Sequence, residues 1–166
     1  WLVVNWRSTI DGRVSCCWTD FEEAGYSLAA HLLAVGCRRV LAFDWLSAQY
    51  GPYGAGIRRA WAEGGRPDAQ LRLYSGPEFI WGETVERIVG EALAEAPARR
   101  PDGLLLGHHR ALMASYGLAY ARRIRIGKEL AVAVFDDVES QEYLHPPCTA
   151  YAQPGYELGE RAVEEM

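Results

Sequence analysis

The chain has 166 residues, of which 49% are apolar, and its 22 acidic residues outnumber 17 basic ones, which gives a net charge of −5. An apolar fraction of this size excludes a disordered chain, and the length suits one sizeable core or two small lobes. The acidic balance argues against nucleic acid as a direct partner, because phosphate contacts need clustered positive charge. No apolar run approaches the ~20 residues of a membrane span, so no membrane partner is expected.

Four cysteines occur without zinc-ligand spacing and without a disulfide framework: Cys16, Cys17, Cys37 and Cys148. The adjacent pair leaves a redox role open, but small core residues in a reducing compartment are favoured. The sequence therefore predicts a cytoplasmic protein that holds neither a metal nor another cofactor.

Strands and helices are predicted to alternate along the chain. Strands are expected at Leu2–Asn5, Arg38–Phe43, Leu71–Tyr74, Leu104–Leu106, Ala131–Phe135 and Cys148–Ala152. Helices are expected from Thr19 or Asp20 to Gly36, and at Pro52–Glu63, Glu83–Ala96, Arg110–Arg123 and Tyr156–Met166. This alternation predicts an α/β fold with a parallel sheet flanked by helices.

The stretch Ala131–Phe135 is apolar at every position, which is typical of a strand buried on both faces. Asp136 and Asp137 follow directly, at the carboxyl end of this strand. Because open α/β sheets bind ligands beyond the carboxyl ends of their strands, Asp136 is a candidate ligand contact. An ordinary acidic cap on the next segment is the alternative.

Two stretches resemble LacI-type transcriptional regulators. Phe135–Asp137 and the residues that follow, through Pro146–Pro147, Thr149, Gln153–Pro154, Leu158–Gly159 and Ala162–Val163, resemble the family's pattern of FDD, PPLTT, QP, LG and AVE. Ala29–Phe43, with the sequence AAHLLAVGCRRVLAF, resembles the family's HLLALGHRRIAFI and lies in the correct order. The resemblance implies the effector-binding core of such a regulator, with the fold of type I periplasmic binding proteins.

The resemblance also implies a division into lobes. Residues 37–145 would form one complete lobe, the C-terminal one, while residues 1–36 and 146–166 would form part of the N-terminal lobe. The sequence opens at Trp1 within an expected strand, and in the family a helix-turn-helix and half a lobe precede this point. The chain is therefore expected to be an N-terminally truncated piece, with ligand bound between the lobes.

Effector contacts follow from the resemblance one residue at a time. Asp136 matches the first Asp of the family's FDD motif, which accepts hydrogen bonds from the effector. His108 and His109 stand where the family commonly has Asn-Asp, and Tyr53 stands at its effector-binding Arg. Gln153 matches the Gln of the QP motif, for which a purely structural role in the hinge is the alternative.

Neighbouring loops supply further candidates for effector contacts. Trp45 and Phe79 offer rings for stacking, and Ser47 offers a neutral hydrogen bond. Because the family's Arg is replaced, the site lacks its strongest donor for a phosphate or carboxylate, and a neutral, carbohydrate-like effector is expected. Loss of effector binding is the alternative, since two usual contacts are replaced.

Assembly and DNA binding are likewise implied by the family. The helix after the Asn-Asp position and the segment after FDD line its homodimer interface, which here would include Tyr116, Tyr120, Tyr143 and Leu144. The alternative is that Tyr116 and Tyr120 face the core of their own lobe. Operator DNA would be bound only by the missing N-terminal domain, so this segment is expected to bind no DNA by itself.

Two other functions have less support in the sequence. An enzyme is not expected, because no GxSxG, HExxH, P-loop or GxGxxG motif occurs and adjacent histidines on a strand point in opposite directions. A periplasmic sugar-binding protein of an ABC transporter shares the fold and is the main alternative. The PPCT, QP and ELG pattern favours the regulator.

Overall fold

The computed structural model describes residues 2–4, 15–44, 52–65, 67–76 and 82–165. Its main sheet has five strands in the order β4-β3-β5-β6-β7, and every neighbouring pair is parallel. The strands are β3 (Arg39–Asp44), β4 (Gln70–Ser75), β5 (Gly103–Leu106), β6 (Ala131–Phe135) and β7 (Thr149–Tyr151). All carboxyl ends therefore meet at one edge of this sheet.

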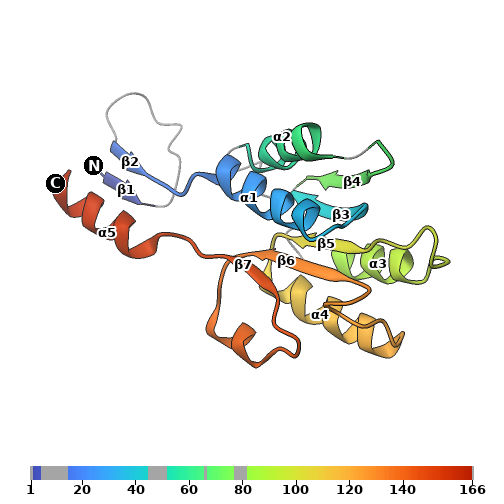
Figure 1. Ribbon diagram of the computed structural model, residues 1–166. Coiled ribbons are helices and arrows are strands. Elements are labelled where there is room, and N and C mark those ends of the chain that lie inside the picture. The colour runs from blue at the N-terminus through green and yellow to red at the C-terminus, as the bar shows by residue number, and fades with distance from the viewer. Residues whose placement is uncertain (1, 5–14, 45–51, 66, 77–81, 166) are drawn as a thin grey trace.

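Helices cover both faces of the main sheet (Figure 1). They are α1 (Phe21–Ala34), α2 (Tyr53–Gly64), α3 (Gly82–Leu93) and α4 (His109–Ala121), and a short 3₁₀ helix, η3 (Glu139–Tyr143), follows β6. The start of α1 is capped by Asp20, whose carboxylate accepts a hydrogen bond from the Glu23 N–H. Gly36, with φ of 97°, ends the same helix.

Strand side chains alternate between two cores, one on each face. The core under α1 and α2 contains Val40, Ala42, Leu105, Ala133 and Phe135. The core under α3 and α4 contains Leu41, Phe43, Leu104, Leu106, Val132 and Val134. Burial on both faces explains why these strands are continuously apolar in sequence.

A second group of elements lies beside the carboxyl edge of the main sheet, and we call it the small unit. It comprises the parallel pair β1 (Leu2–Val4) and β2 (Ser15–Cys17) together with α5 (Gly155–Glu164). The chain passes between the small unit and the rest twice, at residues 18–20 and 152–154 (Figure 1). We call these segments the first and second crossings, and residues 21–151 the sheet unit.

The predicted fold class is confirmed, with a parallel sheet flanked by helices. The structure divides the chain differently from the predicted lobes, which left α1 and β7 out of the range 37–145. In the structure α1 packs on the sheet with α2, and β7 pairs with β6. The physical reason is the apolar stripe of α1, which covers Ala42, Leu105 and Phe135.

The sequence did not predict β2 or η3. None of the helices in the described ranges combines the length and the apolar character that a membrane crossing requires.

Candidate functional site

Asp136 is the first residue beyond β6, and its backbone is left-handed, with φ of 76°. Asp tolerates this conformation better than most residues, although at some cost. The buried Gln141 side chain holds the turn, because its Nε2 donates to the Asp136 carbonyl oxygen over 2.9 Å. The turn therefore places Asp136, half-buried, at the carboxyl edge of the sheet, and its role as a ligand contact stays a prediction.

Gln153 lies in the second crossing and contacts this carboxylate. Its Nε2 donates to Asp136 Oδ1, and its Oε1 accepts a hydrogen bond of 3.1 Å from the hydroxyl of Thr19 in the first crossing. Thr19 is 0% exposed. The predicted pair Asp136 and Gln153 is thus brought together, and Thr19 joins it.

Tyr53 is the first residue of α2 and is 0% exposed, so its ring is part of the core instead of the cleft surface that was predicted. The ring meets Phe135 edge-on, with centroids 5.7 Å apart. Its hydroxyl has no hydrogen-bond partner among the described residues. Burial raises the pKa of Tyr53 well above its usual value, and the carboxylates of Asp44 and Asp136 raise it further.

Asp44 ends β3 and is buried beside the start of α2. Gly54 permits this approach, because a Cβ at that position would lie 2.1 Å from Asp44 Oδ2. The positive end of the α2 dipole favours a carboxylate here, and Ser75 Oγ donates to the same oxygen over 3.4 Å. Asp44 and Asp136 thus stand at the carboxyl ends of β3 and β6, at the same edge of the main sheet.

His108 and His109 follow β5, and they differ in environment. His108 is exposed and caps α4, with its Nδ1 accepting a 3.0 Å hydrogen bond from the Arg110 N–H. Nδ1 of His109 is buried and has no hydrogen-bond partner within the described ranges. Among the residues that the structure describes, no group of His, Cys, Asp or Glu side chains is arranged to hold a metal ion. The predicted contacts Trp45, Ser47 and Phe79 lie outside the described residues.

Comparison with known proteins identifies the family of this chain. Residues 29–166 match the family profile described as "Periplasmic binding protein-like domain". The sucrose operon repressor of Escherichia coli is 30% identical over 151 residues, which cover 87% of this chain and 44% of that protein. A solved regulatory protein of the LacI family from Chloroflexus aggregans has a TM-score of 0.80 at 23% identity, over 97% of this chain and 58% of that one. A LacI family regulator from Enterococcus faecium, solved with bound ribose, has a TM-score of 0.75 at 21% identity, over 98% and 59%.

The chain belongs to the periplasmic binding protein-like domain family, in its LacI-type form. It spans less than half the length of the sucrose operon repressor that it matches. The match agrees with the resemblance found in the sequence, at both the HLLA stretch and the FDD pattern.

In this LacI-type domain the four predicted interface residues separate into two groups. Tyr120 and Tyr143 are 87% and 74% exposed and are available to a partner. Tyr116 is half-buried, and its hydroxyl donates to the Pro146 carbonyl over 2.8 Å. Leu144 is only 8% exposed and packs in the core with α3 and α4. Its side chain is therefore not available to a partner, contrary to the prediction.

A groove of about 600 Å³ runs beside the exposed Tyr120. Its wall is largely apolar and includes Tyr116, Ile124, Ile126 and Pro146. The groove and the exposed Tyr120 therefore lie at the C-terminal half of α4, where the family resemblance places an interface.

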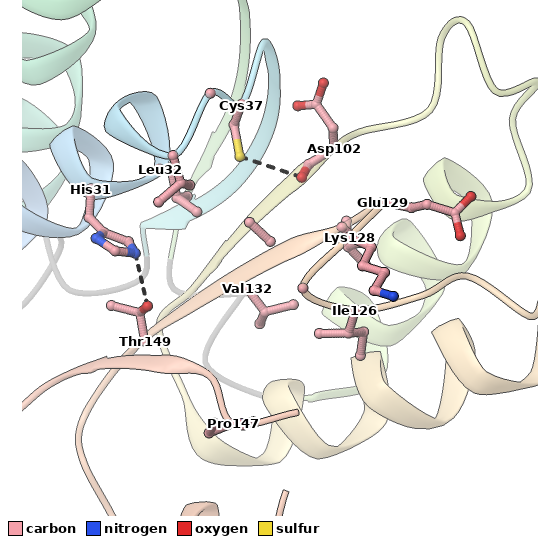
Figure 2. Close-up of a pocket in the computed structure, with 15 residues that line it drawn as sticks. His31, Leu32, Cys37, Asp102, Ile126, Lys128, Glu129, Val132, Pro147 and Thr149 are labelled. Carbon is pink, nitrogen blue, oxygen red and sulfur yellow. Dashed lines mark hydrogen bonds between the residues drawn. The ribbon is translucent and has the colours of Figure 1, made fainter. Parts of the chain in front are cut away.

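A separate pocket of about 430 Å³ opens at the amino ends of the strands, opposite the edge that carries Asp136 (Figure 2). Leu32 and Val132 form apolar walls, and His31 points toward Thr149, with Nε2 and Oγ1 3.0 Å apart. None of the predicted effector contacts in the described ranges lines this pocket. The candidate site at Asp136 and this pocket thus lie at opposite edges of the main sheet.

Thr19 is the residue at the site that sequence reasoning did not assign to it. The sequence predicted that a helix begins at Thr19 or Asp20, and in the structure Asp20 is the N-cap of α1. The partner of Thr19, Gln153, is 134 positions away, and no local pattern reports such a contact. The QP motif identified Gln153, whereas Thr19 is identified only by its contact with Gln153 in the folded chain.

Proposed function

We propose that this LacI-type domain senses a small-molecule effector at the carboxyl edge of its main sheet and thereby controls a DNA-binding transcriptional regulator. The observation that carries the proposal is the half-buried Asp136 carboxylate, which accepts a hydrogen bond from Gln153 in the second crossing and stands on a turn held by Gln141. A ligand that binds an acceptor placed beside the segments joining two lobes can favour one relative position of the lobes over another.

The proposed effector is neutral and carbohydrate-like. The half-buried Asp136 provides an acceptor for hydroxyl donors, and Tyr53 stands where the family has a guanidinium. A phosphate or carboxylate would meet the carboxylates without the Arg that neutralises it elsewhere in the family. Names of similar proteins support sugars as the class, since one relative is a sucrose operon repressor and one structural neighbour holds ribose.

Two further parts of the proposal concern partners. The domain associates as a homodimer through the surface that carries Tyr120 and Tyr143, and operator DNA is bound by a separate region of the full-length regulator. The net charge of −5 supports the second part, because this segment offers little attraction for phosphates. Such a regulator works in the cytoplasm. The alternative role in sugar transport has less support, because relatives that align with most of the chain are named repressors.

A calorimetric screen of sugars and sugar phosphates against the full-length protein tests the effector site. We expect a neutral sugar to bind, and Asp136→Ala to weaken binding by on the order of 2–4 kcal/mol, since it removes a charged acceptor. Asp137→Ala is the matched control, because that neighbouring carboxylate is exposed, and it should leave the affinity unchanged. Tight binding of a phosphorylated or carboxylate ligand that ignores Asp136→Ala would contradict the proposed site.

A further inference from the structure

The two crossings meet at a single amide. The first crossing contributes the buried Thr19 hydroxyl, the second contributes Gln153, and β6 contributes the Asp136 carboxylate. We infer that Thr19, Gln153 and Asp136 form a latch that fixes both crossings to the end of β6, and that an effector acts on the crossings through this latch. The second half of the inference rests on the proposed function, whereas the first half rests on the geometry of the chain alone.

The order of donors and acceptors makes the latch directional. An ionised carboxylate only accepts hydrogen bonds, so Gln153 has to turn its NH₂ group toward Asp136. Its oxygen then faces Thr19, and the Thr19 hydroxyl has to donate. Each group therefore fixes the orientation of the next, from the carboxylate to the first crossing.

Burial makes the arrangement costly to leave. Thr19 is 0% exposed, so bulk water does not reach its side chain, and a lost hydrogen bond to Gln153 is costly. The turn that carries Asp136 is itself held by the buried Gln141, so the backbone from which the carboxylate projects is anchored independently of the crossings. A displacement of the Gln153 amide is thus transmitted to both crossings at once.

The coupling to an effector follows from the shared acceptor. Gln153 occupies Oδ1 of Asp136, and an effector hydroxyl that binds the same carboxylate alters the charge available to that hydrogen bond. Thr19 and Gln153 act as positioning residues, because they hold the crossings in relation to the acceptor that the effector contacts.

Reciprocal exchange of the carboxylate and the amide tests the latch. Gln153→Glu places two carboxylates in contact and should break it, whereas Gln153→Glu combined with Asp136→Asn restores a carboxylate that accepts from both the new amide and Thr19. Hydrogen exchange is measured on the effector-free protein. We expect amides of residues 18–20 and 152–156 to exchange about tenfold faster in Gln153→Glu, and to return to the parent rate in the double variant, while β5 and β6 keep their protection.

Hydroxyl variants supply the controls. Thr19→Val should accelerate exchange in both crossings, Thr19→Ser should preserve the parent rate, and Thr149→Val should leave the crossings unaffected, because the Thr149 hydroxyl instead meets His31 within the sheet unit. Acceleration confined to one crossing, or a double variant that is no better than Gln153→Glu, would overturn the latch.

The coupling is tested separately from the effector site. If calorimetry finds an effector that needs Asp136, its addition should change exchange in both crossings of the parent and have at least severalfold less effect in Thr19→Val. An unchanged effect would overturn the coupling while leaving the proposed function standing. A protein that binds none of the sugars, yet passes the exchange test without effector, would reject the proposed function and retain the latch.

Discussion

At the scale of single residues, Cys37 gives the domain a built-in sensitivity to alkaline pH. The side chain lies under α1 at the start of β3, and its Sγ is 3.5 Å from the Asp102 carbonyl oxygen. Burial, with a smaller effect of the Asp102 carboxylate, raises the pKa of the Cys37 thiol from 9.0 to about 11. The folded protein therefore keeps a proton that the unfolded chain has already lost in this interval.

Because the folded state binds this proton more tightly than the unfolded state, the protein loses stability as the pH rises. The contribution of Cys37 to the free energy of unfolding is fully present below pH 9 and is lost as the pH rises through about 11. We expect the free energy of unfolding to fall between these values by up to about 1.4 kcal/mol per pH unit from this group. Urea unfolding of the parent and of Cys37→Ala at several pH values should show a shallower decline in the variant. Equal slopes would show that the folded thiol ionises as easily as the unfolded one.

Sequence reasoning at this scale succeeded where a motif names the residue. The FDD and QP patterns pointed to Asp136 and Gln153, and the structure joins their side chains. Their role toward an effector stays a prediction. Tyr53 was aligned with a family Arg and was therefore expected in the cleft, but an aromatic ring at this position packs against Phe135 instead. Alignment transfers a position, and the chemistry of the new side chain decides where it points.

At the scale of elements, the crossing of α1 and α2 depends on glycine. A Cβ at Gly56 would lie 1.9 Å from the Glu22 carbonyl oxygen, and one at Gly25 would lie 2.2 Å from the Tyr53 carbonyl oxygen. Backbone atoms of each helix thus fill the space that a side chain on the other would need. The two helices can cover one face of the sheet together because of this close approach.

Gly56→Ala should therefore destabilise the protein by about 3 kcal/mol, because α1 and α2 would be forced apart. The matched control is Gly117→Ala in α4, where a Cβ would meet nothing within 4 Å. That variant should gain on the order of 0.5–1 kcal/mol from helix propensity alone. Denaturant unfolding measures both, and a Gly56→Ala variant as stable as the parent would show that the helices separate at no cost.

Most elements could be predicted because their patterns are local. The apolar run of β6 and the stripe of Val85, Ile88 and Val89 on α3 appear in the sequence and in the core. Membership of a lobe is not local: an apolar stripe such as that of α1 shows that one face is buried, but not which sheet buries it. The three-residue β2 offered no period long enough to recognise.

At the scale of the whole molecule, the proposed homodimer can be tested at the exposed tyrosines. Tyr120→Arg should abolish association, since a charge would be buried in the partner surface, and should not unfold a protomer in which this side chain is 87% exposed. Val35→Arg, at an exposed apolar residue just after α1, is the matched control and should leave association intact.

Sedimentation at several protein concentrations distinguishes the two variants, with circular dichroism to verify folding. A Tyr120→Arg protein that sediments as the parent does, with a normal spectrum, would remove α4 from the proposed interface. A parent that stays monomeric at high concentration would remove the homodimer itself.

The contact between Thr19 and Gln153 also has a consequence for how the polypeptide can be rearranged. Because these side chains touch, the two ends of the sheet unit lie side by side, although 134 positions separate them. The whole parallel sheet with its four helices is therefore one uninterrupted stretch of sequence that enters and leaves at a single point. Such a module can be excised, transplanted into a loop of another protein or circularly permuted by a short linker between its ends. The small unit, by contrast, combines segments that precede and follow the sheet unit, so its described elements are not one continuous stretch.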